Sequence, residues 1–206
     1  MLETFVHRFV KGSSSETLLL LHGTGGDEND LIPFGQQLAP DANLLSPRGK
    51  VLEQGLPRFF RRIRPGVFDL EDLRFRTTEL AEFVRNAAVE YEFDAANVIA
   101  VGYSNGANIA ASALYREANF LSGAVLFRPM NPWPGETPVP LNGIPVLIAA
   151  GRQDLMSSTK DVEDLSASLT RAQANVSLHW YPGGHELGDE DLSVAVSWMK
   201  HLTHKN

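Results

Sequence analysis

The stretch VGYSNGANIA (residues 101–110) decides the fold, because two kinds of sequence pattern meet in it at a single serine. A continuously apolar run stops at Ser104, and a helix-like pattern begins directly afterwards. Gly102 and Gly106 complete the motif G-x-S-x-G, which holds a nucleophilic serine when it lies between a buried strand and a helix. Side chains at these two glycines would collide with the neighbouring strand or helix. A close-packed turn that merely contains a serine is the alternative.

Short apolar runs and longer amphipathic segments alternate along the rest of the chain. Most runs are continuously apolar, which is typical of strands covered on both faces. The alternation predicts an α/β fold with a mostly parallel, doubly wound sheet and helices on both faces. The predicted strands are 17–23, 43–47, 97–103, 122–129, 144–151 and 175–182, with the alternating run 4–10 as an antiparallel edge strand. The predicted helices are 28–39, 77–92, 105–118, 159–174 and 191–202.

Length and charge narrow the class of protein. The 206 residues, 43% of them hydrophobic, predict a single domain spanning 1–206, and we find no internal repeat or linker. A net charge of −7 argues against nucleic acid and anionic membrane surfaces as partners, since both attract positive charge. The chain has no cysteine, which excludes thiolate catalysis, cysteine zinc sites and disulfides.

Targeting signals are not evident in the sequence. The first residues lack the basic start and apolar core of a signal peptide. No apolar run approaches the roughly 20 residues that span a bilayer. We therefore expect a cytoplasmic protein without membrane insertion.

A reactive serine needs a base to remove its proton and an acid to orient that base. In this architecture the three residues follow the chain order Ser, Asp or Glu, His. Asp154 ends GRQD after the run IPVLIAAG, and His185 lies in PGGHELG after the run NVSLHWYP. Both loops leave the carboxyl edge of the predicted sheet, where Ser104 also lies. We predict Ser104 as nucleophile, His185 as base and Asp154 as orienting acid, and we predict structural roles for His22 and His179.

The tetrahedral intermediate of acyl transfer also needs backbone N–H donors for its oxyanion. We predict one donor at Asn105, directly after the serine, and one at Thr24 in the loop HGTGGDEND. A phosphate-binding loop is the alternative, but neither phosphate-loop motif is present and the acidic residues would repel phosphate. The loop also contains three acidic residues, Asp27, Glu28 and Asp30. We predict that they cap the following helix rather than bind a metal, so no metal site is expected.

Two segments interrupt the alternation. Residues 48–76 are rich in arginine and aromatic residues, and 129–142 carry much of the proline. Both leave the edge of the sheet where ligands bind, so we predict that they form pocket walls. The residues predicted to line an acyl or aryl pocket, with core packing as the alternative for some, are Phe59, Phe60, Phe68, Met130 and Trp133. The first segment also contains four clustered arginines, Arg58, Arg61, Arg62 and Arg64. They either pair with Asp69, Glu71 and Asp72 or attract an anionic substrate.

Six stretches of this sequence resemble motifs of the small bacterial carboxylesterases of the phospholipase/carboxylesterase family. They are HGTGGDE, GYSNGAN, GRQD and GGHEL, together with RFFRR and GVFDLEDL. The resemblance covers nearly the whole chain and extends in particular to the esterases associated with hydroquinone resistance. It implies an α/β-hydrolase fold without a large cap domain, ester hydrolysis without a cofactor, and frequent homodimers. It also implies the same site, with Ser104, Asp154 and His185 as triad and Thr24 and Asn105 as oxyanion donors.

Two relatives of that family differ from this sequence. The acyl-protein thioesterases carry Gln after the serine and a shorter H-G-x-G-D loop, so Asn105 and the extra glycine of Gly25–Gly26 depart from their pattern. This departure makes protein-bound palmitate a weaker expectation as substrate. Dienelactone hydrolases use a cysteine nucleophile, and a chain without cysteine is not of that type.

The sequence therefore predicts a serine carboxylesterase that hydrolyses small to medium carboxylic esters through an acyl-enzyme intermediate. Its expected partner is a small-molecule ester. A thioesterase or lysophospholipase with the same triad is the first alternative. A hydrolase-like binding protein that has lost catalysis is the second.

Overall fold

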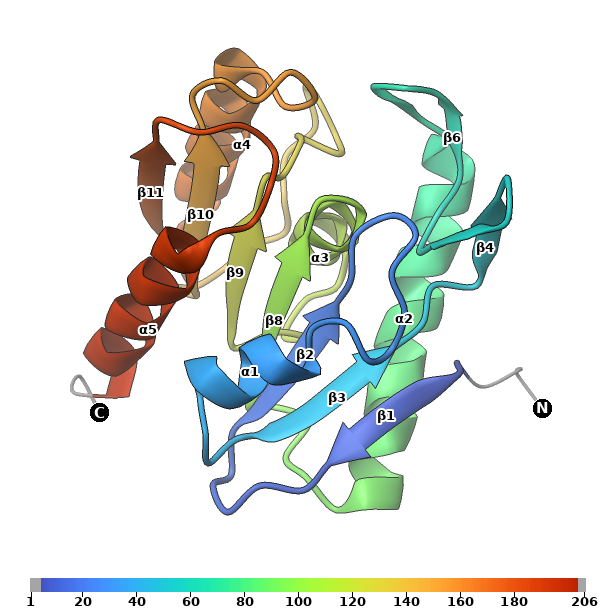
Figure 1. Cartoon of the computed structure of the whole chain (residues 1–206), viewed down its shortest axis with the longest axis vertical. Coiled ribbons are helices and arrows are strands. Elements are labelled where there is room, and N and C mark those ends of the chain that lie inside the picture. The colour runs from blue at the N-terminus through green and yellow to red at the C-terminus, as the bar shows by residue number, and fades with distance from the viewer. Residues whose placement is uncertain (1–4, 204–206) are drawn as a thin grey trace.

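The computed structural model describes residues 5–203, which form a seven-stranded sheet covered by helices (Figure 1). Its strands are β1 (His7–Val10), β2 (Thr17–Leu21), β3 (Asn43–Pro47), β8 (Val98–Tyr103), β9 (Gly123–Phe127), β10 (Pro145–Gly151) and β11 (Asn175–Tyr181). Their order across the sheet is β1-β3-β2-β8-β9-β10-β11. β1 is antiparallel to β3, and the other neighbouring pairs are parallel. The predicted edge strand and mostly parallel sheet are confirmed, although Thr4 lies outside the described residues.

Helices lie on both faces of the sheet, as predicted. They are α1 (Ile32–Leu38), α2 (Leu70–Tyr91), α3 (Asn105–Arg116), α4 (Thr159–Arg171) and α5 (Asp189–Thr203). α1 and α5 pack on one face, and α2, α3 and α4 pack on the other (Figure 1). In the part of the chain that the structure describes, no helix is long and apolar enough to cross a membrane.

The side chains of β2 explain why both faces need a cover. Leu18 and Leu20 belong to the core beneath α1 and α5, while Leu19 and Leu21 belong to the core beneath the other three helices. All four side chains are fully buried. Since burying a leucine contributes about 1.5–3 kcal/mol, an uncovered face would forfeit a large part of the stability of the domain.

The start of α1 differs from the prediction. The helix begins at Ile32 with Pro33 in its first turn, and Leu31 precedes it without a side-chain cap. The predicted acidic cap was therefore wrong. Asp27 instead accepts a hydrogen bond from the Asn29 N–H at 2.7 Å, and Glu28 pairs with the Arg48 guanidinium at 2.6 Å. Within residues 5–203 no three His, Cys, Asp or Glu side chains are grouped so as to hold a metal ion.

The long connection predicted over residues 48–76 is largely structured. It forms two antiparallel hairpins, β4–β5 (Val51–Glu53 and Leu56–Arg58) and β6–β7 (Arg62–Arg64 and Val67–Phe68), beside the carboxyl edge of the sheet (Figure 1). Its last residues belong to α2, which begins at Leu70 rather than at residue 77. The helix starts there because the Asp69 carboxylate accepts a hydrogen bond from the Asp72 N–H at 3.1 Å.

Candidate active site

Ser104 occupies a strained corner between β8 and α3. Its backbone has φ 52° and ψ −111°, outside the regions that residues other than glycine prefer. A Cβ on Gly106 would overlap the carbonyl oxygen of Leu21, and a Cβ on Gly102 would lie 2.6 Å from the backbone nitrogen of Ala107. These are the collisions that the sequence motif predicts. The two glycines therefore allow α3 to begin directly against β2 and leave the serine at the turn.

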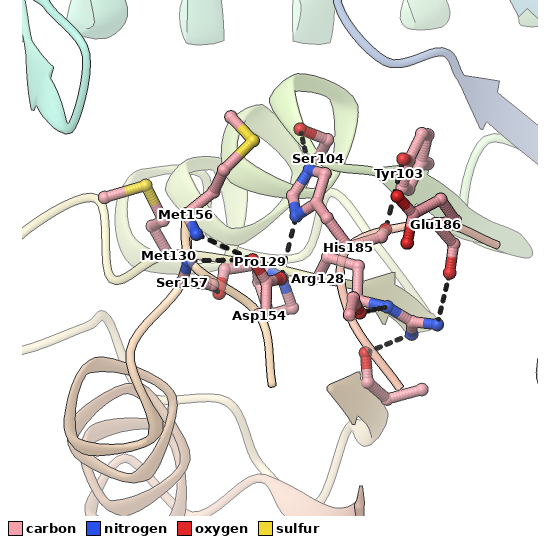
Figure 2. Close-up of polar contacts among 12 residues, drawn as sticks. Tyr103, Ser104, Arg128, Pro129, Met130, Asp154, Met156, Ser157, His185 and Glu186 are labelled. Atoms are coloured by element: carbon pink, nitrogen blue, oxygen red, sulfur yellow. Dashed lines mark hydrogen bonds and ion pairs between the residues drawn. The ribbon is translucent and has the colours of Figure 1, made fainter. Parts of the chain in front are cut away.

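The structure brings Ser104, His185 and Asp154 together in one hydrogen-bonded chain (Figure 2). His185 Nε2 lies 2.9 Å from Ser104 Oγ, and His185 Nδ1 lies 2.7 Å from Asp154 Oδ2. The Asp154 carboxylate is buried, and its Oδ1 accepts hydrogen bonds from the N–H groups of Met156 and Ser157. Because a carboxylate only accepts, Nδ1 carries the proton and Nε2 is free to take one from the serine hydroxyl.

Thr24 and Asn105, the predicted oxyanion donors, line one cavity together with Ser104. Thr24 lies in the loop that follows β2, and Asn105 is the first residue of α3. The first N–H groups of an α-helix have no acceptor within the helix, so the Asn105 N–H is available to a ligand. The start of α3 also adds the positive end of its dipole next to the serine.

A short segment at the end of β5 joins both donor regions. Residues 57–59 contact the loop after β2 on one side and the start of α3 on the other. The Gly25 N–H donates to the Pro57 carbonyl at 2.9 Å, the Arg58 guanidinium donates to Thr24 Oγ1 at 2.6 Å, and the Phe59 N–H donates to Asn105 Oδ1 at 2.7 Å. This segment therefore fixes Thr24 and Asn105 relative to each other.

His22 is buried and structural, as predicted. Its Nδ1 donates to the Gly23 carbonyl at 2.6 Å, and its Nε2 accepts from the Gly49 N–H at 2.9 Å. Burial lowers the pKa of His22, although the Gly23 hydrogen bond and nearby carboxylates oppose that change. The neutral ring thus ties the loop of Thr24 to the segment that leads into the hairpins.

The cavity beside Ser104 has a volume of about 230 Å³. Of the residues predicted to line it, Phe68 and Met130 do so. Phe59, Phe60 and Trp133 do not, because their side chains are buried in the core, where Trp133 Nε1 donates to Ser112 Oγ. The pocket prediction was wrong for these three residues. Leu155 and Met156, directly after Asp154, supply apolar lining that the prediction omitted.

The arginines of the cluster have different ion-pair partners. Arg61 pairs with Asp69 and Asp72, as one alternative predicted. Arg58 and Arg62 instead share the single carboxylate of Glu53, at 3.1 and 2.9 Å. Both also line the cavity, so one positive charge there is not balanced by this ion pair.

The strand order, the strained serine corner and the chain order Ser, Asp, His define an α/β-hydrolase fold without a large cap domain. The chain belongs to the dienelactone hydrolase family, whose model matches residues 70–190. The chain differs from those dienelactone hydrolases that use a cysteine nucleophile, because it contains no cysteine.

Individual relatives cover almost the whole chain. The protein named "Putative hydrolase MhqD" of Bacillus subtilis is 47% identical over 194 residues, which cover 94% of this chain and 97% of that protein. The crystal structure of a Bacillus cereus carboxylesterase is 49% identical, has a TM-score of 0.94 and covers 96% of this chain and 94% of its own. The structure of YahD with malic acid is 31% identical, with a TM-score of 0.92 and coverage of 96% and 99%. These similarities confirm the resemblance to small bacterial carboxylesterases.

The loop of His185 is held by residues that the sequence did not predict as part of the site. Four side chains bind this loop or each other: Tyr103, Arg128, Tyr181 and Asp191. One signal was available: Arg128 comes directly before the final proline of the run SGAVLFRP, where a charge directly follows a fully buried strand.

Gly106→Ala should lower the free energy of unfolding by about 1–3 kcal/mol, because the added methyl group would overlap the backbone of Leu21. Thermal unfolding followed by circular dichroism measures the change. Gly188→Ala is the matched control, since a Cβ there meets no atom within 4 Å. Equal unfolding temperatures for the two variants would contradict the assigned contact between α3 and β2.

Protonation of His22 should destabilise the fold at low pH. Since the folded pKa lies below the ordinary value of about 6.5, the unfolded chain binds the proton more tightly. The contribution is fully present above pH 6.5 and declines below it, by at most about 1.4 kcal/mol per pH unit. His22→Gln should flatten the fall in urea-unfolding free energy between pH 7 and 5. An unchanged slope in His22→Gln would assign the effect to other groups.

Proposed function

We propose that this protein is a serine carboxylesterase that hydrolyses small to medium carboxylic esters through an acyl-enzyme intermediate. The observation that carries the proposal is the hydrogen-bonded chain from Ser104 through His185 to the buried Asp154. The names of two relatives, a putative hydrolase and a carboxylesterase, support the same class of reaction.

Acylation begins when Ser104 Oγ attacks the ester carbonyl carbon and His185 Nε2 takes the hydroxyl proton. Asp154 keeps the imidazole in the tautomer that can accept this proton, and stabilises the imidazolium that forms. The carbonyl oxygen becomes an oxyanion and receives hydrogen bonds from the N–H groups of Thr24 and Asn105. When the intermediate collapses, the C–O bond to the alcohol breaks and His185 gives its proton to the leaving oxygen.

Deacylation repeats the sequence with water as nucleophile. His185 removes a proton from a water molecule, whose oxygen attacks the acyl carbon of the Ser104 ester. The second tetrahedral intermediate uses the same two N–H donors. Its collapse breaks the bond to Ser104 Oγ, which recovers the proton from His185, and the carboxylic acid leaves.

The dimensions of the cavity favour small acyl groups. Its volume of about 230 Å³ lies below the roughly 300–1,000 Å³ of pockets that enclose drug-sized ligands. Phe68, Met130, Leu155 and Met156 provide an apolar lining for a short acyl or aryl group. A long-chain thioesterase or lysophospholipase would have to leave most of the chain outside this cavity. Turnover of esters and thioesters of increasing chain length should therefore fall beyond short acyl groups.

Ser104→Ala should lower the turnover of p-nitrophenyl acetate and butyrate by at least about 10⁴-fold without a change in fold, because no other group supplies the nucleophile. Spectrophotometric release of p-nitrophenol measures the rate, and circular dichroism checks the fold. Retention of wild-type turnover by this variant would reject the assignment.

A fluorophosphonate probe separates the enzyme from the binding-protein alternative. The wild type should become covalently labelled at Ser104, whereas Ser104→Ala should not. A folded wild-type protein that takes up no label would favour a hydrolase-like binding protein instead.

The positive charge of the cavity suggests a preference within the ester class. Arg58 and Arg62 face the ligand space with only the Glu53 carboxylate between them. An ester that carries a carboxylate on its acyl or alcohol part would complete the charge balance. Malic acid, present in the structure of the relative YahD, shares the carboxylate with such an ester but is itself a hydroxy dicarboxylic acid.

Arg62→Gln should raise KM for p-nitrophenyl hemisuccinate by about 10-fold, while KM for the neutral p-nitrophenyl butyrate stays within about twofold. Arg62 is the residue to change because it lines the cavity with a partly exposed side chain, whereas Arg58 also binds Thr24. Arg64→Gln is the control on the same strand, since Arg64 does not line the cavity. Equal effects on the charged and the neutral ester would remove the proposed preference.

A further inference from the structure

The loop that carries His185, residues 182–188 between β11 and α5, contains no helix or strand. The imidazole can reach both Ser104 and Asp154 only while this loop keeps its conformation. Three consecutive carbonyl groups of the loop accept hydrogen bonds from side chains of other elements. They belong to Gly184, His185 and Glu186.

Arg128, the residue after β9, supplies most of these bonds. Its side chain is fully buried, and all of its N–H donors have acceptors. Nη1 and Nη2 bind the two oxygens of Asp191 in α5 at 2.8 and 2.7 Å. The remaining donors reach backbone carbonyls and one hydroxyl: Ala149 O at 3.1 Å, Glu186 O at 2.8 Å, Gly184 O at 3.2 Å and Tyr181 Oη at 3.2 Å.

Two tyrosines complete the set. Tyr181, the last residue of β11, donates its hydroxyl to the carbonyls of Gly184 and Glu186, and its ring lies 4.1 Å from the Arg128 guanidinium carbon. Tyr103, beside the serine, donates to the His185 carbonyl at 3.1 Å. Figure 2 shows Arg128 against the backbone of Glu186, on the side of His185 away from Ser104. The loop is thus held from both sides.

We propose that Arg128, together with Tyr181, is a positioning residue that holds the imidazole of His185 between Ser104 and Asp154. The inference rests on the proposed function, because the position of His185 matters to that reaction. If position 128 served only to pair with Asp191, any positively charged side chain would be enough, and the planar guanidinium fork would not be needed. The fork is what allows one side chain to bind a carboxylate and two carbonyls that flank the histidine.

The backbone of Arg128 adds an independent observation. Its φ is 55°, in the left-handed region that residues other than glycine rarely adopt. An arginine there places its side chain beneath the His185 loop at the expense of backbone strain. Strain of this kind is concentrated at functional sites.

Arg128→Lys tests the proposal, because lysine keeps the charge opposite Asp191 but lacks the fork. We expect kcat for p-nitrophenyl acetate to fall by about 10- to 100-fold, with KM within about twofold of wild type. The proton NMR resonance of His185 Nδ1–H, deshielded by Asp154 in the wild type, should broaden or disappear. A folded Arg128→Lys variant with wild-type kcat and an unchanged resonance would overturn the proposal.

Glu79→Gln is the control for a loss of stability alone. Glu79, on α2, forms ion pairs with Lys50 before β4 and with Arg76 on its own helix, and it does not line the cavity. This variant should lower the unfolding temperature but keep kcat and the resonance. If kcat fell equally in Glu79→Gln and Arg128→Lys at matched stability, the effect would be a general one and the proposal would fail.

Tyr181→Phe provides a second route if Arg128→Lys does not fold. It removes the hydroxyl bonds to Gly184 and Glu186 and leaves the pair of Arg128 and Asp191 intact. We expect kcat to fall by about 3- to 10-fold. Wild-type kcat and an unaltered resonance in this variant would overturn the positioning role. Since the resonance requires no substrate, a wild type without esterase activity would reject the proposed function while the NMR comparison still decides the inference.

Discussion

The contact between Gly106 and the carbonyl of Leu21 is the constraint on which the site depends. It lets α3 begin directly against β2. Ser104, with a φ of 52°, therefore lies at the carboxyl end of β8. The loop that contains Thr24 starts one residue after Leu21. The same contact therefore also influences the separation between Thr24 and Asn105, so the proposed nucleophile and the two proposed oxyanion donors depend on a single piece of backbone packing.

Parallel strands bring the reactive groups to one edge, but they do not orient them. Orientation comes from hydrogen bonds at two separate places. Residues 57–59 bind the regions of Thr24 and Asn105, the predicted oxyanion donors, and Arg128 with its tyrosine neighbours binds the loop of His185. Both supports use buried arginine, whose fixed geometry and several donors suit it to bind more than one loop at once.

The layer order and the meeting of Ser104, Asp154 and His185 could be predicted, because apolar runs and glycine positions are local signals and parallel topology then gathers the strand ends. The inward or outward direction of loop side chains could not. Phe59, Phe60 and Trp133 pack into the core although their segments look like pocket walls. Acidic residues such as Glu28 can either cap a helix or form ion pairs, and only the position of Arg48 decides between the two. The inward turn of Arg128 depends on an unusual φ that the sequence does not encode in a recognisable motif.

The segment of the two hairpins is at once a wall of the cavity and a support of the proposed oxyanion donors. Arg62 and Phe68 line the cavity, while residues 57–59 form hydrogen bonds to Gly25, Thr24 and Asn105. Under the proposed function, selectivity and rate therefore both depend on this segment. A substitution in β6 or β7 would alter the cavity alone, whereas an insertion or deletion in β5 would also shift Thr24 and Asn105. We therefore expect β6 and β7, rather than β5, to tolerate the changes that alter which ester is accepted.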